Sequence, residues 1–290
     1  METNKVYKNV SLTKFNSWKV GGKAENFVIC SDINFLCQLI KNKKIERPIK
    51  FIGLGSNILI RDNGVKGTTI VMHKGLNNFF KEEELFYSEA GLSCSKFSKL
   101  IAKEGHIGSA FLSGIPGTIG GALTMNAGCY GSEIWSFVKK VKMINADGDL
   151  VERNPNDFKV GYRKIQKKNE AENFVGAWFS FPKGKKLEAE KSIRKLLSHR
   201  KSTQPLSWPS AGSTFKNPDN NHAAKLIEDC GLKGFKIGDA KISEKHANFI
   251  INLGAARAKD IEDLIKHIKK IVFRETKIKL IPEVEIIGDV

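Results

Sequence analysis

Apolar residues recur at intervals of three and four positions in several segments of the chain. These segments are 32–44, 93–104, 187–200 and 260–276. Such spacing aligns the apolar side chains along one face of a helix, so the pattern predicts amphipathic helices. The last segment is the most regular, because Ile261, Leu264 and Ile268 share one side, and Asp260 is a candidate N-cap.

Short runs of apolar and β-branched residues between these segments predict strands. The runs lie at 26–30, 50–53, 68–72, 85–89, 141–145, 174–181, 247–252 and 284–287. Asp147-Gly148 separates two strand-like pieces and is a strong hairpin signal, so at least part of the sheet should be antiparallel. Helices mixed with antiparallel strands predict an α+β protein rather than a doubly wound one.

The length and composition indicate a folded protein with more than one domain. A chain of 290 residues suits roughly two domains, and 41% hydrophobic with 27% charged residues is ordinary for a protein with a core. The charged segment 183–195 is the best candidate for the junction. It is not rich in Gly or Ser, so we expect a helix there rather than a flexible linker.

The net charge of +17 predicts attraction to anions, which could be nucleic acid, acidic lipid or a phosphorylated small molecule. The charge alone does not choose among them. The lysines are spread along the whole chain, and no nucleic-acid-binding motif accompanies them. This distribution favours a generally basic surface over a nucleic-acid-binding stripe.

Several features are expected to be absent. No segment is long and apolar enough for a membrane span, and the first residues lack the apolar run of a signal peptide, so we expect a cytoplasmic protein. The five cysteines form no C-x-x-C pair, which favours reduced thiols over disulfides or a zinc site. The histidines lack metal-ligand spacing, so we expect no catalytic metal.

A first glycine cluster lies between two β-like runs and consists of Gly53, Leu54, Gly55, Ser56 and Asn57. Glycine allows positive φ and close approach of the main chain to a pyrophosphate. The third glycine of a G-x-G-x-x-G motif is missing, and strand rather than helix is expected to follow. A phosphate-binding turn and a plain tight turn are about equally supported.

A second glycine-rich segment, 112–128, is otherwise apolar. Surface loops are usually polar, so this composition favours buried backbone packed against a flat ligand over close packing of strands. The residues that we expect to contact a cofactor are Gly114, Ile115, Pro116, Gly117, Thr118, Gly120, Gly121, Ala122 and Asn126.

Three further places carry reactive or polar side chains. The segment 209–218 combines Ser213 with Lys216 and Asn217, and its prolines predict an irregular loop that suits a polar ligand. Ser213 is not in a G-x-S-x-G context, which disfavours a hydrolase. Arg163 follows Tyr162 and could hold a carboxylate in two hydrogen bonds. Glu283 begins an apolar strand, where partial desolvation would raise its pKa. A surface arginine and a solvated glutamate are the simpler interpretations.

These segments together resemble one family, the UDP-N-acetylenolpyruvoylglucosamine reductases. The resemblance extends over nearly the whole chain and rests on seven motifs in the same order. They are Asn16–Gly22, Gly53–Asn57, Ser113–Gly131, Gly161–Arg163, Ser210–Pro218, Gly238–Phe249 and Pro282–Val284.

The resemblance implies non-covalently bound FAD, with NADPH as the reductant and UDP-N-acetylglucosamine enolpyruvate as the substrate. The implied fold has FAD-binding subdomains at 1–72 and 73–185, similar to vanillyl-alcohol oxidase, and a substrate-binding domain at 186–290. It also implies that Arg163, Ser213 and Glu283 are catalytic. Hydride addition places negative charge on the carboxylate, which a cation and a hydrogen-bond donor stabilise, and a hydroxyl can protonate the α-carbon.

The implied substrate contacts are Tyr162, Lys216 and Asn217. Two features depart from the commonest pattern of the family. Ile165 stands where a serine is frequent two residues after the arginine, which puts one substrate contact in doubt. The stretch from Arg163 to Ser213 is also too short for a tyrosine-bearing insertion, which indicates the shorter branch of the family.

Two rival interpretations remain from the sequence. Another FAD-dependent oxidase or dehydrogenase acting on an alcohol or sugar would share the glycine clusters but has no need for Ser213 and Glu283 in these contexts. A basic nucleic-acid binder accounts for the charge but for none of the motifs. The sequence does not define the oligomeric state.

Overall fold

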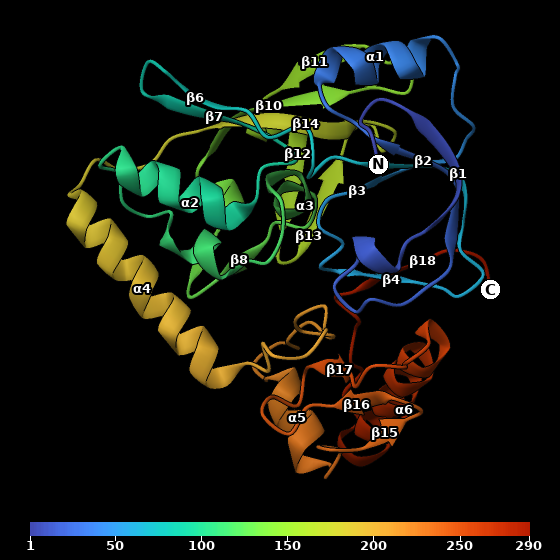
Figure 1. Cartoon of the computed structure of the whole chain (residues 1–290). Helices are drawn as coiled ribbons and strands as arrows, with labels where there is room; N and C mark the ends of the chain where they lie inside the picture. The colour runs from blue at the N-terminus through green and yellow to red at the C-terminus, as the bar shows by residue number, and fades with distance from the viewer. The chain divides into compact units, whose positions relative to one another are not determined.

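The computed structural model describes residues 1–290 and divides into two compact units (Figure 1). The first unit contains 1–7, 26–54 and 67–200, and the second contains 8–25, 55–66 and 201–290. The chain therefore passes between the units several times before residue 67. None of its helices is long and apolar enough to cross a membrane.

The larger sheet of the first unit is antiparallel, with the strand order β11-β10-β14-β7-β6. Its strands are β6 (Phe79–Glu82), β7 (Leu85–Glu89), β10 (Val138–Ile144), β11 (Leu150–Arg153) and β14 (Asn173–Phe179). Helix α2 (Cys94–Lys103) packs against one face (Figure 1), where its Phe97 joins Phe86 and Phe179 in one buried core.

A second, four-stranded sheet has the order β1-β2-β5-β3. Its strands are β1 (Val6–Ser11), β2 (Lys23–Ile29), β3 (Ile49–Ile52) and β5 (Val65–Val71), and β3 pairs with β5 in parallel. Helix α1 (Ile33–Lys41) begins at Asp32, whose Oδ1 accepts from Phe35 N at 2.7 Å. Leu36 of α1 and Ile70 of β5 belong to the same core.

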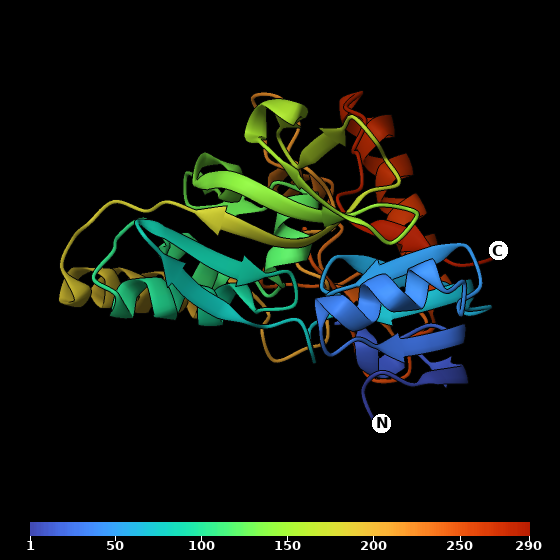
Figure 2. The same cartoon turned by 90° about the horizontal axis from the view of Figure 1, so that it is seen from above.

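Shorter elements complete the first unit (Figure 2). They are the helix α3 (Ile119–Thr124), the hairpin strands β8 (Gly128–Cys129) and β9 (Ser132–Glu133), and the hairpin strands β12 (Phe158–Gly161) and β13 (Lys164–Lys167). Three 3-10 turns lie at Ala110–Gly114, Ile134–Ser136 and Pro155–Asp157. Helix α4 (Lys186–Thr203) leads out of this unit.

The second unit packs helices on one face of a three-stranded antiparallel sheet. Its elements are α5 (Ala223–Asp229), β15 (Lys236–Ile237), β16 (Ala240–Ile242), β17 (Ile250–Asn252) and α6 (Ala258–Thr276). A separate parallel pair joins β4 (Ile58–Ile60) to β18 (Glu285–Ile287), and a 3-10 turn lies at Thr13–Phe15. Ile261 and Ile268 of α6 are fully buried with Leu59 of β4.

The α+β class and the main elements agree with the sequence predictions. The hairpin at Asp147-Gly148 is confirmed, since β10 and β11 pair antiparallel around it. The helix expected near 183–195 is also confirmed. The proposed cap of the last helix was misplaced, because Asp260 is inside α6 and accepts from Arg257 N at 2.9 Å. The division at 72 and 185 stays a prediction.

Candidate active site

The first glycine cluster is the turn that leaves β3. Gly53 is half-buried, and its carbonyl oxygen lies 2.8 Å from Nδ1 of His73. Gly55 has φ +65°, a left-handed conformation that favours glycine. The backbone N–H groups of residues 54–57 donate no hydrogen bond within the protein. Such a run of free donors is suited to an anion.

The second cluster is built around helix α3. Thr118 is its N-cap, and the Thr118 hydroxyl accepts from Gly121 N at 3.4 Å. A Cβ on Gly53 would collide with that same hydroxyl oxygen. The two glycine clusters, far apart in the sequence, therefore meet at Gly53 and Thr118, and the absence of a side chain permits the approach.

Gly117 and Gly120 hold the start of α3 against the segment that runs from the end of β7 to the start of α2. Gly120 N donates to Ala90 O at 2.8 Å, and a Cβ on Gly120 would lie 2.8 Å from the Cβ of Ala90. Gly117 O accepts from Cys94 N at 2.9 Å. Of the other predicted cofactor residues, Pro116 is exposed and Ala122 is buried. Gly114, Ile115, Pro116 and Gly121 are not buried, so this part of the segment is accessible to a ligand such as a dinucleotide.

Asn126, which the sequence predicts as a cofactor contact, has its side chain engaged elsewhere. It is fully buried with φ +46°, and its Nδ2 donates to Glu133 Oε2 at 2.7 Å and to Gly161 O at 3.1 Å. It therefore joins the β8–β9 hairpin to the end of β12. The polar part of this side chain supports the loop that carries Arg163.

Arg163 lies at the turn between β12 and β13, with φ +52°. Its guanidinium donates to the carbonyl oxygens of Asn126 and Gly128, and its Nη1 lies 3.7 Å from Glu133 Oε1. The Tyr162 ring lies beneath the guanidinium, 5.0 Å from Cζ. The arginine is thus fixed by several contacts, unlike an ordinary surface arginine. Ile165 packs at the edge of the core of this unit.

Ser213 and Glu283 lie close together in the second unit. Thr214, which follows Ser213, accepts from Glu283 N at 2.8 Å through its carbonyl, and Phe215 forms an antiparallel bridge with Pro282. Ser213 and Glu283 are both half-buried. Two side chains from opposite ends of this domain are therefore held at neighbouring backbone positions.

Lys216 and Asn217 continue the same loop. Lys216 N donates to Ile281 O at 2.9 Å, which extends the pairing with the C-terminal segment. Asn217 Oδ1 accepts from Ala223 N at 3.1 Å, so this amide satisfies one of the first N–H groups of α5. Asn217 is otherwise exposed.

Two asparagines position this pair, and the sequence had not predicted Asn248 as a site residue. Asn248 is buried and binds the backbone of Phe215 with both ends of its amide. Asn57 Nδ2 donates to Glu283 O at 3.0 Å, although it was predicted as a cofactor contact. Asn248 belongs to the segment Gly238–Phe249, one of the motifs that carry the family resemblance, but nothing in the sequence reveals its long-range partner.

The environment shifts the pKa of several groups near these sites. Burial lowers the pKa of His73, although its hydrogen bond to Gly53 opposes the shift. Burial raises the pKa of the Cys129 thiol to about 11, with the charges of Arg163 and Arg200 opposing. Burial also lowers the pKa of Arg200. Cys129 is therefore a neutral thiol at neutral pH and a poor nucleophile.

Comparison with known proteins gives matches over both parts of the chain. Residues 26–154 match the family described as FAD binding domain, and residues 204–287 match the family described as UDP-N-acetylenolpyruvoylglucosamine reductase, C-terminal domain. The cofactor expected from the glycine clusters is thus supported by a family match.

Whole-length relatives carry the second of these names. The UDP-N-acetylenolpyruvoylglucosamine reductase of Nitrosomonas eutropha is 45% identical, over 94% of this chain and 85% of its own. That of Thiobacillus denitrificans is 41% identical, over 97% and 91%. The crystal structure of the Thermus caldophilus reductase covers 98% of this chain and 99% of its own, with a TM-score of 0.84 and 30% identity.

Proposed function

The chain belongs to the UDP-N-acetylenolpyruvoylglucosamine reductase family, and we propose that Arg163, Ser213 and Glu283 perform its reaction. The enzyme is an FAD-dependent oxidoreductase that reduces UDP-N-acetylglucosamine enolpyruvate to UDP-N-acetylmuramate, with NADPH as the reductant. Bound FAD, once reduced by NADPH, supplies the hydride for the β-carbon of the enolpyruvyl group. Membership of this family decides against an alcohol or sugar oxidase.

The observation that carries the proposal is the pairing of the Ser213 loop with Glu283 through the bond from Glu283 N to Thr214 O. A proton donor to the α-carbon and a donor to the carboxylate must reach the same three-carbon group. Two half-buried side chains on directly paired segments meet that requirement. The backbone pairing keeps both in place without depending on their own side-chain contacts.

Arg163 would stabilise the charge that develops on the substrate carboxylate. Hydride addition to the β-carbon moves an electron pair toward the carboxyl group and produces an enediolate. A fixed guanidinium lowers the energy of that charge more than a mobile one, because little reorganisation is needed during the reaction. Its contacts with Asn126, Gly128 and Tyr162 supply this rigidity.

Ser213 would donate the proton that completes the reduction. The enediolate collapses to a carboxylate as the α-carbon takes the hydroxyl proton of Ser213, and solvent returns a proton to the serine oxygen. Glu283, in its protonated form, would donate a hydrogen bond to a carboxyl oxygen of the enediolate. The hydride and the proton together account for the two atoms added across the double bond.

The residues proposed to hold FAD are those of the two glycine clusters. The free N–H groups of residues 54–57 would bind phosphate oxygens, and the surface formed by Gly114, Ile115, Pro116, Gly117, Thr118, Gly120, Gly121 and Ala122 would lie against the cofactor. Tyr162, Lys216 and Asn217 are proposed to contact the substrate. A serine contact at the position of Ile165 is not available to this enzyme.

The product is a precursor of peptidoglycan, so we further propose a role in cell-wall synthesis, cell shape and cell division. We place the reaction in the cytoplasm, because NADPH and UDP-linked sugars are charged compounds that cells retain there. We propose no nucleic-acid or membrane partner.

The replacement Ser213→Ala tests the assignment of the proton donor. We expect the NADPH-reduced variant to be reoxidised by the substrate about 10²–10⁴-fold more slowly, while reduction by NADPH stays within about twofold of the wild type. Ser210→Ala, three residues away on the same half-buried loop, is the matched control. Equal reoxidation rates for the Ser213 variant and the wild type would refute this role.

A further inference from the structure

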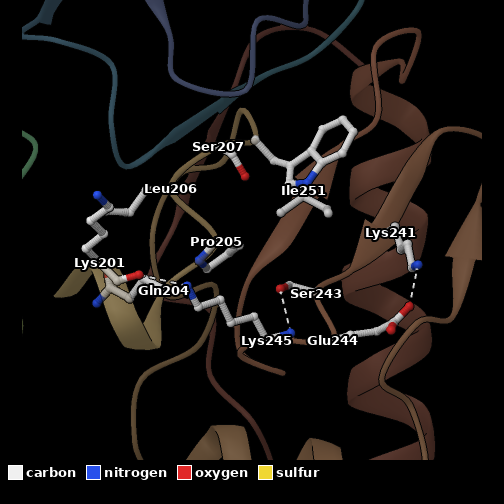
Figure 3. Close-up of a pocket in the computed structure, with 11 residues that line it drawn as sticks. Lys201, Gln204, Pro205, Leu206, Ser207, Lys241, Ser243, Glu244, Lys245 and Ile251 are labelled. Carbon is white, nitrogen blue, oxygen red and sulfur yellow. Dashed lines mark hydrogen bonds and ion pairs between the residues drawn. The ribbon is translucent and has the colours of Figure 1, made fainter. Parts of the chain in front are cut away.

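The second unit contains a hollow that none of the proposed catalytic or substrate-binding residues lines. Its volume is about 470 Å³, and it lies between the loop 204–208 and strands β16 and β17 (Figure 3). Ile242 and Ile250 point into the core shared with α6, so Lys241 and Ile251, which alternate with them, face the opposite side. The hollow is thus on the sheet face that α6 does not cover.

The wall of the hollow is apolar and partly exposed. Pro205 and Ile251 are buried, whereas Leu206 and Trp208 are 48% and 45% exposed. Trp208 is the exception among the four tryptophans, since the other three are at most 6% exposed. Its indole N–H donates no hydrogen bond. An exposed indole at the mouth of a hollow offers a flat surface on which a ring can stack.

The polar part of the lining is cationic. Lys201, Lys241 and Lys245 all line the hollow, against one carboxylate, Glu244. Lys241 is already paired with Glu244 at 2.5 Å, whereas Lys201 has no carboxylate partner. Lys245 Nζ donates to Lys201 O at 2.7 Å, which holds the two lysines together. The unpaired charge at this end favours an anion.

A buried hydroxyl adds a specific donor beside these lysines. Ser243 is only 2% exposed and lines the hollow. Its oxygen accepts from Lys245 N at 3.2 Å and from His246 N at 3.4 Å, so both contacts use the oxygen as acceptor. The hydroxyl hydrogen has no acceptor within the protein. An anionic oxygen in the hollow would satisfy it.

We propose that this hollow binds a small amphipathic anion, with a flat apolar ring against Trp208 and a phosphate or carboxylate near Lys201, Lys245 and Ser243. The volume lies within the range of roughly 300–1,000 Å³ that is usual for small-molecule sites. An apolar wall with a few convergent polar groups at one end is the arrangement that orients such ligands. The proposal does not depend on the assignment of Ser213, Arg163 or Glu283.

The probe for this site is α-naphthyl phosphate. Its neutral counterpart is α-naphthol, and the anion of 1-naphthaleneacetic acid serves as the carboxylate. Each is titrated into the FAD-loaded enzyme labelled with fluorotryptophan, and the tryptophan resonances are followed by fluorine NMR. Trp208→Phe assigns the Trp208 signal. We expect α-naphthyl phosphate or 1-naphthaleneacetate to shift that signal saturably. The affinity for α-naphthol should be at least about tenfold lower, which corresponds to about 1.4 kcal/mol.

Two lysine variants test the charged end. Lys201→Met and Lys245→Met should each weaken binding of the phosphate several-fold. Lys270→Met removes the same charge from an exposed position on α6 and should leave binding unchanged. The proposal is overturned if neither anion shifts the Trp208 signal at millimolar concentration, if α-naphthol binds as tightly, or if the Lys201 variant binds like the Lys270 variant.

Discussion

Asn248 binds the backbone of Phe215 at both polar groups of that residue. Its Oδ1 accepts from Phe215 N at 2.9 Å, and its Nδ2 donates to Phe215 O at 2.8 Å. Its own carbonyl also accepts from Thr214 N at 2.8 Å. The short loop that presents Ser213 is therefore fixed by a side chain more than thirty positions later in the sequence.

Replacing this asparagine should damage both stability and catalysis. Asn248→Ala leaves two buried backbone groups unpaired, at a cost of about 1–3 kcal/mol each. Asn248→Asp keeps the acceptor but loses the donor, so its effect should be smaller. Urea unfolding measures the stability, and single-turnover reoxidation of the reduced flavin measures the effect on Ser213. Asn63→Ala, at an exposed position, is the control. Unchanged kinetics in Asn248→Ala would remove the positioning role.

Glu283 is expected to act through a hydrogen bond from its side chain. Glu283→Gln keeps a donor in nearly the same place, whereas Glu283→Ala removes it. We expect Glu283→Ala to lower kcat about 10²–10³-fold, with a smaller loss for Glu283→Gln.

The Glu283 variants should remain folded, because the bond to Thr214 uses the backbone N–H. Their circular dichroism spectra check this point. Glu285→Ala, at an exposed position two residues later, is the matched control. Steady-state rates of the same size for Glu283→Ala and Glu285→Ala would contradict the assignment.

The replacement Asn126→Ala tests whether the side chain of Asn126 supports the loop that carries Arg163 or contacts FAD. If its side chain mainly supports the Arg163 loop, Asn126→Ala raises KM for the enolpyruvyl substrate and leaves the Kd of FAD within about twofold. Loss of the two partly buried hydrogen bonds from Nδ2 and of the one from Trp135 N to Oδ1, together with an alanine at φ +46°, should also destabilise the protein by about 2–4 kcal/mol.

Flavin fluorescence titration measures the Kd of FAD for this variant. Asn34→Ala, at an exposed position in α1, controls for the loss of an amide. A large increase in the Kd of FAD with unchanged KM would instead make Asn126 a cofactor contact.

The half-buried histidine beside Gly53, His73, predicts a pH dependence. Burial depresses the pKa of His73 below its ordinary value of 6.5, so the unfolded state takes up the proton more readily than the folded state. Stability is therefore complete above pH 6.5 and falls as the pH drops from there toward the folded pKa. His246 is shifted in the same direction for the same cause.

Urea unfolding at several pH values between about 7 and 5 measures this slope. We expect His73→Gln, whose amide can still donate to Gly53 O, to unfold with a weaker pH dependence than the wild type. His222→Gln, at an exposed position, should keep the wild-type slope. Identical slopes for His73→Gln and the wild type would exclude His73 as a source of the effect.

The sequence predicted which segments form the site better than it predicted the contacts between those segments. Both glycine clusters were found from composition, because apolar glycine-rich runs are rare in ordinary loops. Their meeting at Gly53 and Thr118 is a contact between distant segments, and no local pattern encodes it. The helix α3 inside the second cluster was also missed, since glycine is a poor helix former.

Side-chain roles were harder to predict than the fold. The helix α5 has only seven residues, too few for a clear periodic pattern, so the use of Asn217 at its start was not foreseen. The start of α6 was misplaced for a different reason. Its first N–H groups, at Ala258 and Lys259, donate to Asp62, which is remote in the sequence, at 3.0 Å.

The most direct test of the function follows the flavin through both halves of the reaction. The purified FAD-loaded protein is reduced with NADPH under anaerobic conditions, and UDP-N-acetylglucosamine enolpyruvate is then added while the visible flavin absorbance is recorded. We predict loss of the absorbance with NADPH and its rapid recovery with this substrate, accompanied by UDP-N-acetylmuramate. A reduced flavin that this substrate does not reoxidise would contradict the assigned reaction.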